Sequence, residues 1–130
     1  MTGEVTGSTI EVRKDNWGET RVVAETYDDQ LADNEVLLKV DRLALTANNI
    51  SYANAGDTLG YWGFFPADEG WGRIPAMGWG EVIASAHADI VVGERVWGWF
   101  PFSNYLKIQA GKVSASTIVD VSAHRAKYAP

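Results

Sequence analysis

The sequence predicts a mainly β fold, built as a small barrel or sandwich with one or two short helices. Several short segments rich in β-branched residues are separated by turns rich in glycine, which is typical of such folds. The chain contains no internal repeat and no heptad pattern. Its 130 residues, of which 46% are hydrophobic and 22% charged, have the size and composition of one soluble globular domain.

The N-terminal half contains two predicted strands. Residues 1–9 are small and polar, so we expect a flexible N-terminus, followed by one β-barrel domain over residues 10–130. The first strand is predicted over residues 21–28, RVVAETYD, because this segment is rich in β-branched residues. The clearest strand is EVLLKVDRLALT, residues 35–46, in which the alternation of side chains shifts at Asp41–Arg42. That shift predicts a bulge, as expected where a sheet curls.

The middle of the chain changes character. Residues 47–56 contain Asn and Ser, then alanines, and end with Gly56, which predicts a short helix with a glycine C-cap. Residues 59–73 form a predicted loop that is rich in aromatic residues, which indicates a functional loop because aromatic residues argue against disorder. Further β segments are predicted at residues 80–86, 94–100, 103–108 and 117–122, and residues 123–130 could begin a helix.

The composition excludes several classes of function. The net charge is -6 and the basic residues are scattered, so we expect no nucleic-acid partner, which would need clustered positive charge. The absence of cysteine excludes disulfides, thiolate zinc sites and a cysteine nucleophile. His87 and His124 lie far apart, without ligand spacing, so no metal site is expected. No apolar run approaches the ~20 residues of a membrane helix and no signal peptide is visible, so we expect a cytoplasmic protein without a membrane partner.

Five segments follow one another in a recognisable order. They are EVLLKV, YANAG, IPAMGWGEVIAS, VVGERVWGW and SNYLKI. In this order they resemble the N-terminal GroES-like domain of the medium-chain dehydrogenase/reductase superfamily, over about residues 21–122. The resemblance implies a GroES-like, partly open β-barrel. It also implies that the chain is the substrate-side domain of an NAD(P)H-dependent oxidoreductase from an uncharacterised branch of the superfamily.

Two departures from that superfamily bear on the cofactors. Its zinc-dependent members carry a cysteine, which falls here near Thr46 or Ala47, and a histidine where this chain has Trp79, so the resemblance is to zinc-free reductases. The G-x-G-x-x-G pattern of a Rossmann domain is absent, so we expect no cofactor in this chain, and NADPH only if such a domain follows. The ending SAHRAKYAP favours a domain cut from a longer protein.

Tyr52 is the candidate catalytic residue. With Gly56 it matches the Tyr-x-x-x-Gly pattern of zinc-free reductases, and a phenol can donate a proton to an enolate or hold a carbonyl oxygen. The alternative is a half-buried tyrosine whose ring packs on the barrel. Asn48 and Asn49 fit the Asn and Asp of those reductases only with a one-residue gap. They could bind a substrate carbonyl or a cofactor ribose, or they could cap the short helix.

Glu81 is a second candidate for chemistry. A buried carboxylate at this position could act as a base. Alternatively, it could form a structural ion pair, for which Arg73 and Arg95 are the available partners. A solvated turn histidine is expected at His87.

Aromatic residues are concentrated in one part of the sequence. Ten of the fifteen lie between Tyr61 and Phe102, more than a small barrel needs to fill its core. We expect those of the predicted loop to line an apolar ligand cleft or a partner surface, because they cannot all be buried. The candidate substrate-binding aromatic residues are Trp62, Phe64, Phe65, Trp71 and Trp79.

Three functions are compatible with these features. The chain could be the substrate-side domain of a reductase, with a Rossmann domain or a homodimer partner on its aromatic face. It could instead be a stand-alone β-barrel module that binds an apolar small molecule or self-associates, without catalysis. A third possibility is a cofactor-free cyclase or isomerase that uses Tyr52 and Glu81, although no diagnostic spacing supports it.

Overall fold

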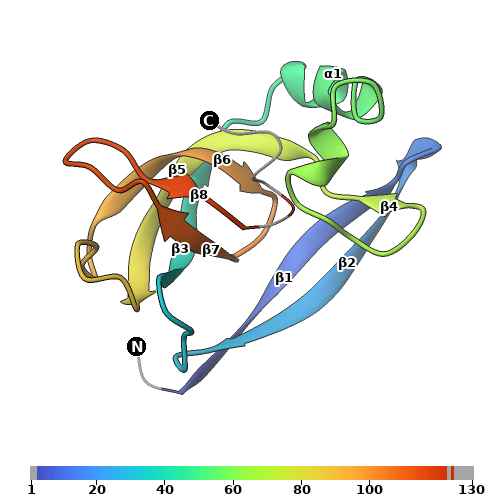
Figure 1. Ribbon diagram of the computed structural model, residues 1–130. Helices are drawn as coiled ribbons and strands as arrows, with labels where there is room; N and C mark the ends of the chain where they lie inside the picture. The colour runs from blue at the N-terminus through green and yellow to red at the C-terminus, as the bar shows by residue number, and fades with distance from the viewer. Residues whose placement is uncertain (1–2, 123, 125–130) are drawn as a thin grey trace.

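The computed structural model describes residues 3–122 and residue 124, and it is mainly β (Figure 1). Two antiparallel sheets have the strand orders β6-β5-β3-β7-β8 and β2-β1-β4. The strands are β1 (Glu4–Arg13), β2 (Asn16–Asp28), β3 (Glu35–Leu43), β4 (Trp71–Gly72), β5 (Pro75–Ser85), β6 (Arg95–Pro101), β7 (Tyr105–Gly111) and β8 (Val119–Asp120). Among the described residues, the named elements also include one helix, α1 (Asn48–Asn54), and one 3-10 turn, η1 (Tyr61–Gly63). The predicted class, mainly β with a partly open barrel and a short helix, is confirmed.

The five-stranded sheet curls around a core that β3 supplies. Val36, Leu37 and Leu38 are almost completely buried, and Val36 and Leu38 pack with Val82 and Phe100. Burial of each such side chain stabilises the fold by roughly 1.5–3 kcal/mol. The pairing of β3 with β5 shifts register between Val40 and Arg42, so the bulge predicted at Asp41–Arg42 is confirmed. The bulge increases the local twist and helps the sheet to curl.

The barrel stays open between its two terminal strands. β6 and β8 are the ends of the strand order, and neither pairs with the other. The strands predicted at 80–86, 94–100 and 103–108 are present as β5, β6 and β7, while the segment 117–122 forms only the two-residue β8. β5 begins earlier than predicted because Pro75 and Ala76 pair with Pro101 and Phe100 of β6.

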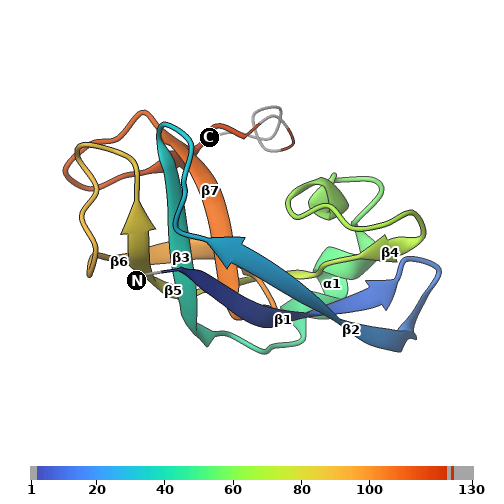
Figure 2. The same cartoon turned by 90° about the horizontal axis from the view of Figure 1, so that it is seen from below.

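The N-terminal segment expected to be flexible is a strand from Glu4 onward. β1 pairs with β2 along its whole length, and the Thr6 and Thr26 hydroxyl groups lie 3.0 Å apart across the hairpin. The sequence did not predict this strand because residues 1–9 have little apolar character, and its order comes from pairing with a longer partner strand. Figure 2 shows the hairpin running from the curled sheet toward β4 and α1. The strand predicted over residues 21–28 is the second half of β2.

The short helix predicted over residues 47–56 is α1, but its C-terminus differs from the prediction. The C-cap is Ala55 with φ −92, so no residue there needs the left-handed conformation. Gly56 is required for space instead, because a Cβ atom would lie 2.2 Å from Nε1 of Trp62. Trp62 joins Val12 and Ala53 in a second, smaller core. Within the described part of the chain, neither helix has the length and apolar character needed to cross a membrane.

Candidate functional site

Four aromatic rings meet where α1, η1 and β6 converge. Tyr52 of α1 lies 5.1 Å, between ring centroids, from both Tyr61 and Trp99. Phe64 completes the group, 5.4 Å from Tyr61 and 5.7 Å from Trp99. All four side chains are half-buried. We call this group the aromatic cluster, and its tilted and edge-to-face contacts are the arrangements that aromatic pairs favour.

Tyr52 is therefore held by packing on two sides. Its ring stands nearly perpendicular to Trp99, at 78°, and tilts by 42° against Tyr61. This matches the packing role considered for Tyr52 from the sequence. The proton-donor role of Tyr52 stays a prediction.

Asn48 and Asn49 belong to a helix start rather than to an open pocket. The Thr46 hydroxyl accepts a hydrogen bond from the Asn48 backbone N–H at 3.2 Å, and the Asn49 carboxamide oxygen accepts one from the Thr46 N–H at 2.7 Å. This reciprocal pattern resembles a capping box, but the N-cap of α1 is Ala47 and the Thr46 hydroxyl bonds the residue two positions on, so it is a local variant of that motif. Asn49 is 5% exposed, and its Nδ2 also donates to the Pro75 carbonyl at 3.3 Å. Its hydrogen-bonding groups are thus used to join α1 to β5.

We expect Asn49→Ala to lower the free energy of unfolding by about 1–2 kcal/mol, because the variant leaves the Pro75 carbonyl and the Thr46 N–H without their partner. Urea denaturation of the two proteins measures the difference. Asn48→Ala is the matched control, since the Asn48 side chain is exposed, and it should change stability by less than about 0.5 kcal/mol. Equal effects of the two substitutions would contradict this role of Asn49.

The five candidate aromatic residues lie in separate places. Trp62 and Phe65 are buried, with 7% and 4% exposure, and Phe64 belongs to the aromatic cluster. Trp71 is half-buried between two guanidinium groups, and Trp79 is 42% exposed on β5. Trp62 is enclosed by the second core, and its predicted contact with a substrate stays a prediction. The sequence could not separate it from its neighbours because all of them lie in one irregular segment.

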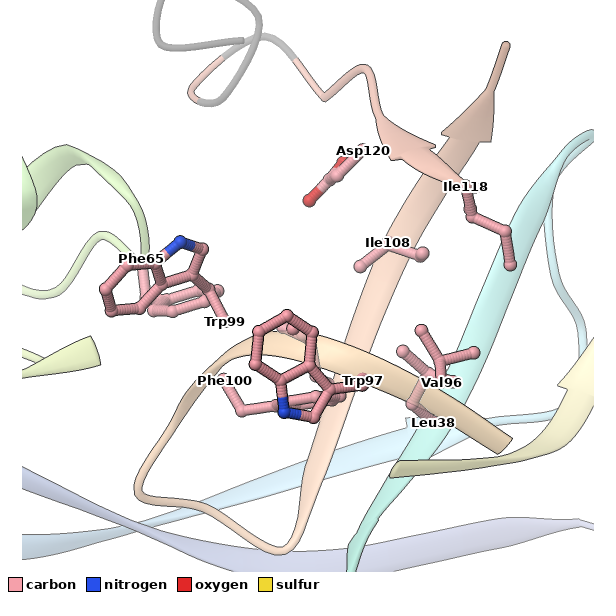
Figure 3. Close-up of a pocket in the computed structure, with 11 residues that line it drawn as sticks. Leu38, Phe65, Val96, Trp97, Trp99, Phe100, Ile108, Ile118 and Asp120 are labelled. Atoms are coloured by element: carbon pink, nitrogen blue, oxygen red, sulfur yellow. The ribbon is translucent and has the colours of Figure 1, made fainter. Parts of the chain in front are cut away.

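A cavity of about 110 Å³ opens next to the aromatic cluster (Figure 3). Four aromatic residues contribute to its lining, Phe65 from the loop after η1 and Trp97, Trp99 and Phe100 from β6. Opposite them lie aliphatic side chains of β7 and the carboxylate of Asp120 from β8. The cavity thus occupies the open side of the barrel, between β6 and β8. We call it the aromatic cavity.

A buried carboxylate that the sequence did not reveal lies on the other sheet. Glu11 of β1 is 2% exposed, and its two oxygens accept from Arg21 at 2.7 Å and from Arg73 at 2.8 Å. Arg73 also pairs with Glu25, which accepts a hydrogen bond from the Tyr27 hydroxyl. A prediction of the β1–β2 hairpin from the sequence could have revealed the Glu11–Arg21 pair, because the register of the hairpin places these two residues directly opposite each other.

The ion pairs shift the pKa values of two groups. Burial raises the pKa of the Tyr27 phenol. The hydrogen bond to Glu25 and the negative charge of the Glu25 carboxylate raise this pKa further. Burial by itself lowers the pKa of Arg73, but its hydrogen bonds to Glu11 and Glu25 outweigh this effect and the pKa lies above its ordinary value. The protonated forms of both groups are therefore favoured in the folded protein.

Trp71 extends this network to the surface. The guanidinium carbon of Arg21 lies 4.1 Å from the centre of the Trp71 ring, and that of Arg13 lies 5.1 Å from it. Arg21 also reaches the exposed carboxylate of Asp68 at 3.2 Å. These contacts join the segment between η1 and β5 to the β1–β2 hairpin, and the predicted place of Trp71 in a cleft stays a prediction.

Glu81 does not form the predicted ion pair. Its side chain is exposed, Arg73 pairs with Glu11 and Glu25, and Arg95 pairs with Asp41, whose pKa it lowers by a hydrogen bond. The prediction was wrong because the pairing of β5 places Glu81 on the outer face of the sheet, where no burial forces a partner on it.

The two histidines lie apart from these groups. His87 lies in a turn, as predicted, where its Nδ1 accepts a hydrogen bond from the Asp89 backbone N–H at 3.1 Å. His124 is half-buried. Among the residues that the structure describes, no three His, Asp or Glu side chains are grouped to hold a metal ion.

A family model described as "Protein of unknown function (DUF2855)" matches residues 43–130, more than half of the chain. The chain belongs to this family. No curated protein matches the chain. The DUF2855 segment includes α1, η1, β5 and β6, and hence every member of the aromatic cluster and Asp120 of the aromatic cavity. Arg73 lies within it, whereas Glu11 belongs to the hairpin that precedes it.

Proposed function

We propose that this DUF2855 chain is the substrate-side, GroES-like domain of a zinc-independent medium-chain reductase-like protein. The aromatic cluster carries the proposal, because it gathers Tyr52 with three other rings on one face. Such a surface forms one wall of an apolar cleft, and a nucleotide-binding domain supplies the other wall. The elements that these five segments form support the proposal, since they contain the strand β3, the short helix α1 and the strands β5, β6 and β7, as the resemblance implies.

In this function the aromatic wall excludes water from the reacting carbonyl or enone, which strengthens electrostatic interactions in the cleft. Tyr52 donates a proton to the enolate that hydride transfer leaves, and its two ring contacts fix the direction of the phenol. The chain itself binds no nicotinamide cofactor; NADPH is held by the other domain. We place no metal in the reaction.

Titration with NADPH tests whether the nucleotide is bound by the other domain and not by this chain. We expect residues 1–130 alone to give no saturable change in NADPH fluorescence, and the product of the complete gene to bind NADPH and reduce an apolar enone or quinone. In that product, Tyr52→Phe should lower kcat by about 100-fold with little change in KM, because it removes the proton donor but keeps the ring packing. Tyr105→Phe is the control, because Tyr105 packs on Tyr27 outside the aromatic cluster, and it should leave kcat unchanged. Tight NADPH binding by residues 1–130 alone, or full activity of Tyr52→Phe, would refute the proposal.

A second function, a stand-alone module that self-associates, has one observation in its favour. Trp79 and Trp97 stand opposite each other on β5 and β6, and they are 42% and 59% exposed. Exposed aromatic pairs of this kind are frequent in protein interfaces. Sedimentation of residues 1–130 should then show a dimer that Trp97→Ser dissociates. A clean monomer whose tryptophan fluorescence no hydrophobic ligand quenches would exclude this function.

A further inference from the structure

We propose that the aromatic cavity is a binding site for a small organic cation, such as an alkylated ammonium group, with Asp120 as its counter-charge. The proposal does not depend on the reductase-like function, since every residue of the site lies in this chain. It follows from the chemistry of the lining and from the position of one carboxylate.

The aromatic cavity has rings on two of its sides. In the view of Figure 3, Phe65 and Trp99 appear on one side of the lining, and Trp97 and Phe100 on another. Asp120 projects from β8 toward the space between these rings. Aromatic faces carry negative electrostatic potential, so cations bind over them, and the gain rises to about 2 kcal/mol where water is excluded.

Asp120 keeps one oxygen available. Its Oδ1 accepts hydrogen bonds from the backbone N–H and the hydroxyl group of Ser122, at 3.0 Å and 2.5 Å, and lies 3.4 Å from the Gln109 backbone nitrogen. These bonds fix the orientation of the carboxylate. Among the described residues, no hydrogen bond or ion pair is made to Oδ2. A fixed carboxylate with an unshared oxygen, facing aromatic rings, favours a positive ligand.

Other ligand classes fit the lining less well. An anion would meet both the Asp120 carboxylate and the negative faces of the rings. A divalent metal ion needs several oxygen or nitrogen ligands, and the lining offers one carboxylate. A neutral apolar molecule would leave Asp120 without compensation. An alkylated ammonium group is weakly hydrated and interacts with both the rings and the carboxylate, and a cavity of about 110 Å³ is large enough for such a group.

The surroundings also favour a cation. The chain carries a net charge of -6, which raises the local concentration of positive ligands. A second hollow of about 520 Å³ adjoins the first and shares Val96, Trp97 and Ile118 with it. Of the described residues that line it, two are acidic, Asp89 and Glu94, and one is basic, Arg95. A substituent of the ammonium group can extend past Trp97 into this hollow.

Choline and its uncharged isostere 3,3-dimethylbutan-1-ol test the proposal, because they have the same shape and differ in charge. We expect choline to quench the tryptophan fluorescence of residues 1–130 saturably, with Kd on the order of 1 mM, at constant ionic strength. The alcohol should bind at least about tenfold more weakly. Calorimetric titration of both compounds provides the independent measurement. No saturable binding of choline, or equal binding of the alcohol, would refute the proposal without affecting the reductase-like function.

Three variants locate the site. Asp120→Asn keeps the acceptor oxygen for Ser122 but removes the charge, and should weaken choline binding about tenfold while leaving the alcohol unchanged. Trp97→Leu should weaken choline binding by a similar factor, and Trp97 is exposed enough for the fold to tolerate the change. Trp17→Leu is the matched control, because Trp17 lies on the β1–β2 hairpin and lines neither hollow, and it should bind choline normally. Loss of binding in Trp17→Leu with normal binding in Trp97→Leu would place the cation elsewhere and refute the site.

Discussion

Glu11→Gln is expected to lower the free energy of unfolding by about 3 kcal/mol. The carboxylate of Glu11 is 2% exposed and contacts two guanidinium groups, so the substitution leaves Arg21 and Arg73 near each other without the negative charge between them. Removing one partner of a buried ion pair typically costs about 3–5 kcal/mol, and the lower end applies here because Arg21 retains 30% exposure. Urea denaturation followed by tryptophan fluorescence measures the change.

Glu19→Gln is the control for Glu11→Gln. Glu19 lies on the same hairpin and its carboxylate lies 3.7 Å from Nε of Arg13, but its side chain is 57% exposed. An exposed pair contributes little, so the change should stay below about 0.5 kcal/mol. The double variant Glu11→Leu with Arg73→Met should be more stable than Glu11→Leu alone, because it removes an uncompensated buried charge together with its partner. If Glu11→Gln were as stable as Glu19→Gln, the ion network would not hold the hairpin.

The strands around the core were predictable because the sequence pattern that indicates each strand lies within the strand itself. Residues 35–43 show both the run of apolar residues and the shift in alternation that the bulge then explains. β1 was missed because its residues 4–9 depend on a partner strand for their order. The same limit applies to the end of α1, where Gly56 resembles a C-cap in the sequence but is required by Trp62, which packs against it from η1.

The candidate site was predicted only in outline, for a similar reason. The sequence indicated a concentration of aromatic residues between Tyr61 and Phe102, and three members of the aromatic cluster lie in that region and pack with Tyr52 or with one another. It could not assign each ring to a core or a surface, because Trp62 and Phe64 differ only in how the chain turns at η1. Glu11 and Arg73 are 62 residues apart, so their ion pair depends on the pairing of β4 with β1, which brings Arg73 to the hairpin. Asp120 had no local signal at all.

Gly78→Ala and Gly98→Ala are expected to have opposite effects, although the two glycines are direct partners across β5 and β6. A Cβ atom on Gly78 would lie 2.1 Å from the carbonyl oxygen of Arg42 and 2.9 Å from a methyl carbon of Leu43. The Arg42 oxygen is backbone in the bulged part of β3 and can move only if the β3–β5 pairing moves with it. We expect Gly78→Ala to lower the free energy of unfolding by about 2–3 kcal/mol.

Gly98 offers the matched comparison. A Cβ atom there would meet no atom within 4 Å, and its backbone does not adopt the left-handed conformation. Alanine restricts the unfolded chain more than glycine does, so Gly98→Ala should leave stability unchanged or raise it by up to about 1 kcal/mol. Thermal and urea denaturation of both variants measure the two effects. Both variants gain the same methyl group in adjacent strands. Equal stabilities would therefore contradict the close approach of the Arg42 carbonyl oxygen, in the bulge of β3, to Gly78 of β5.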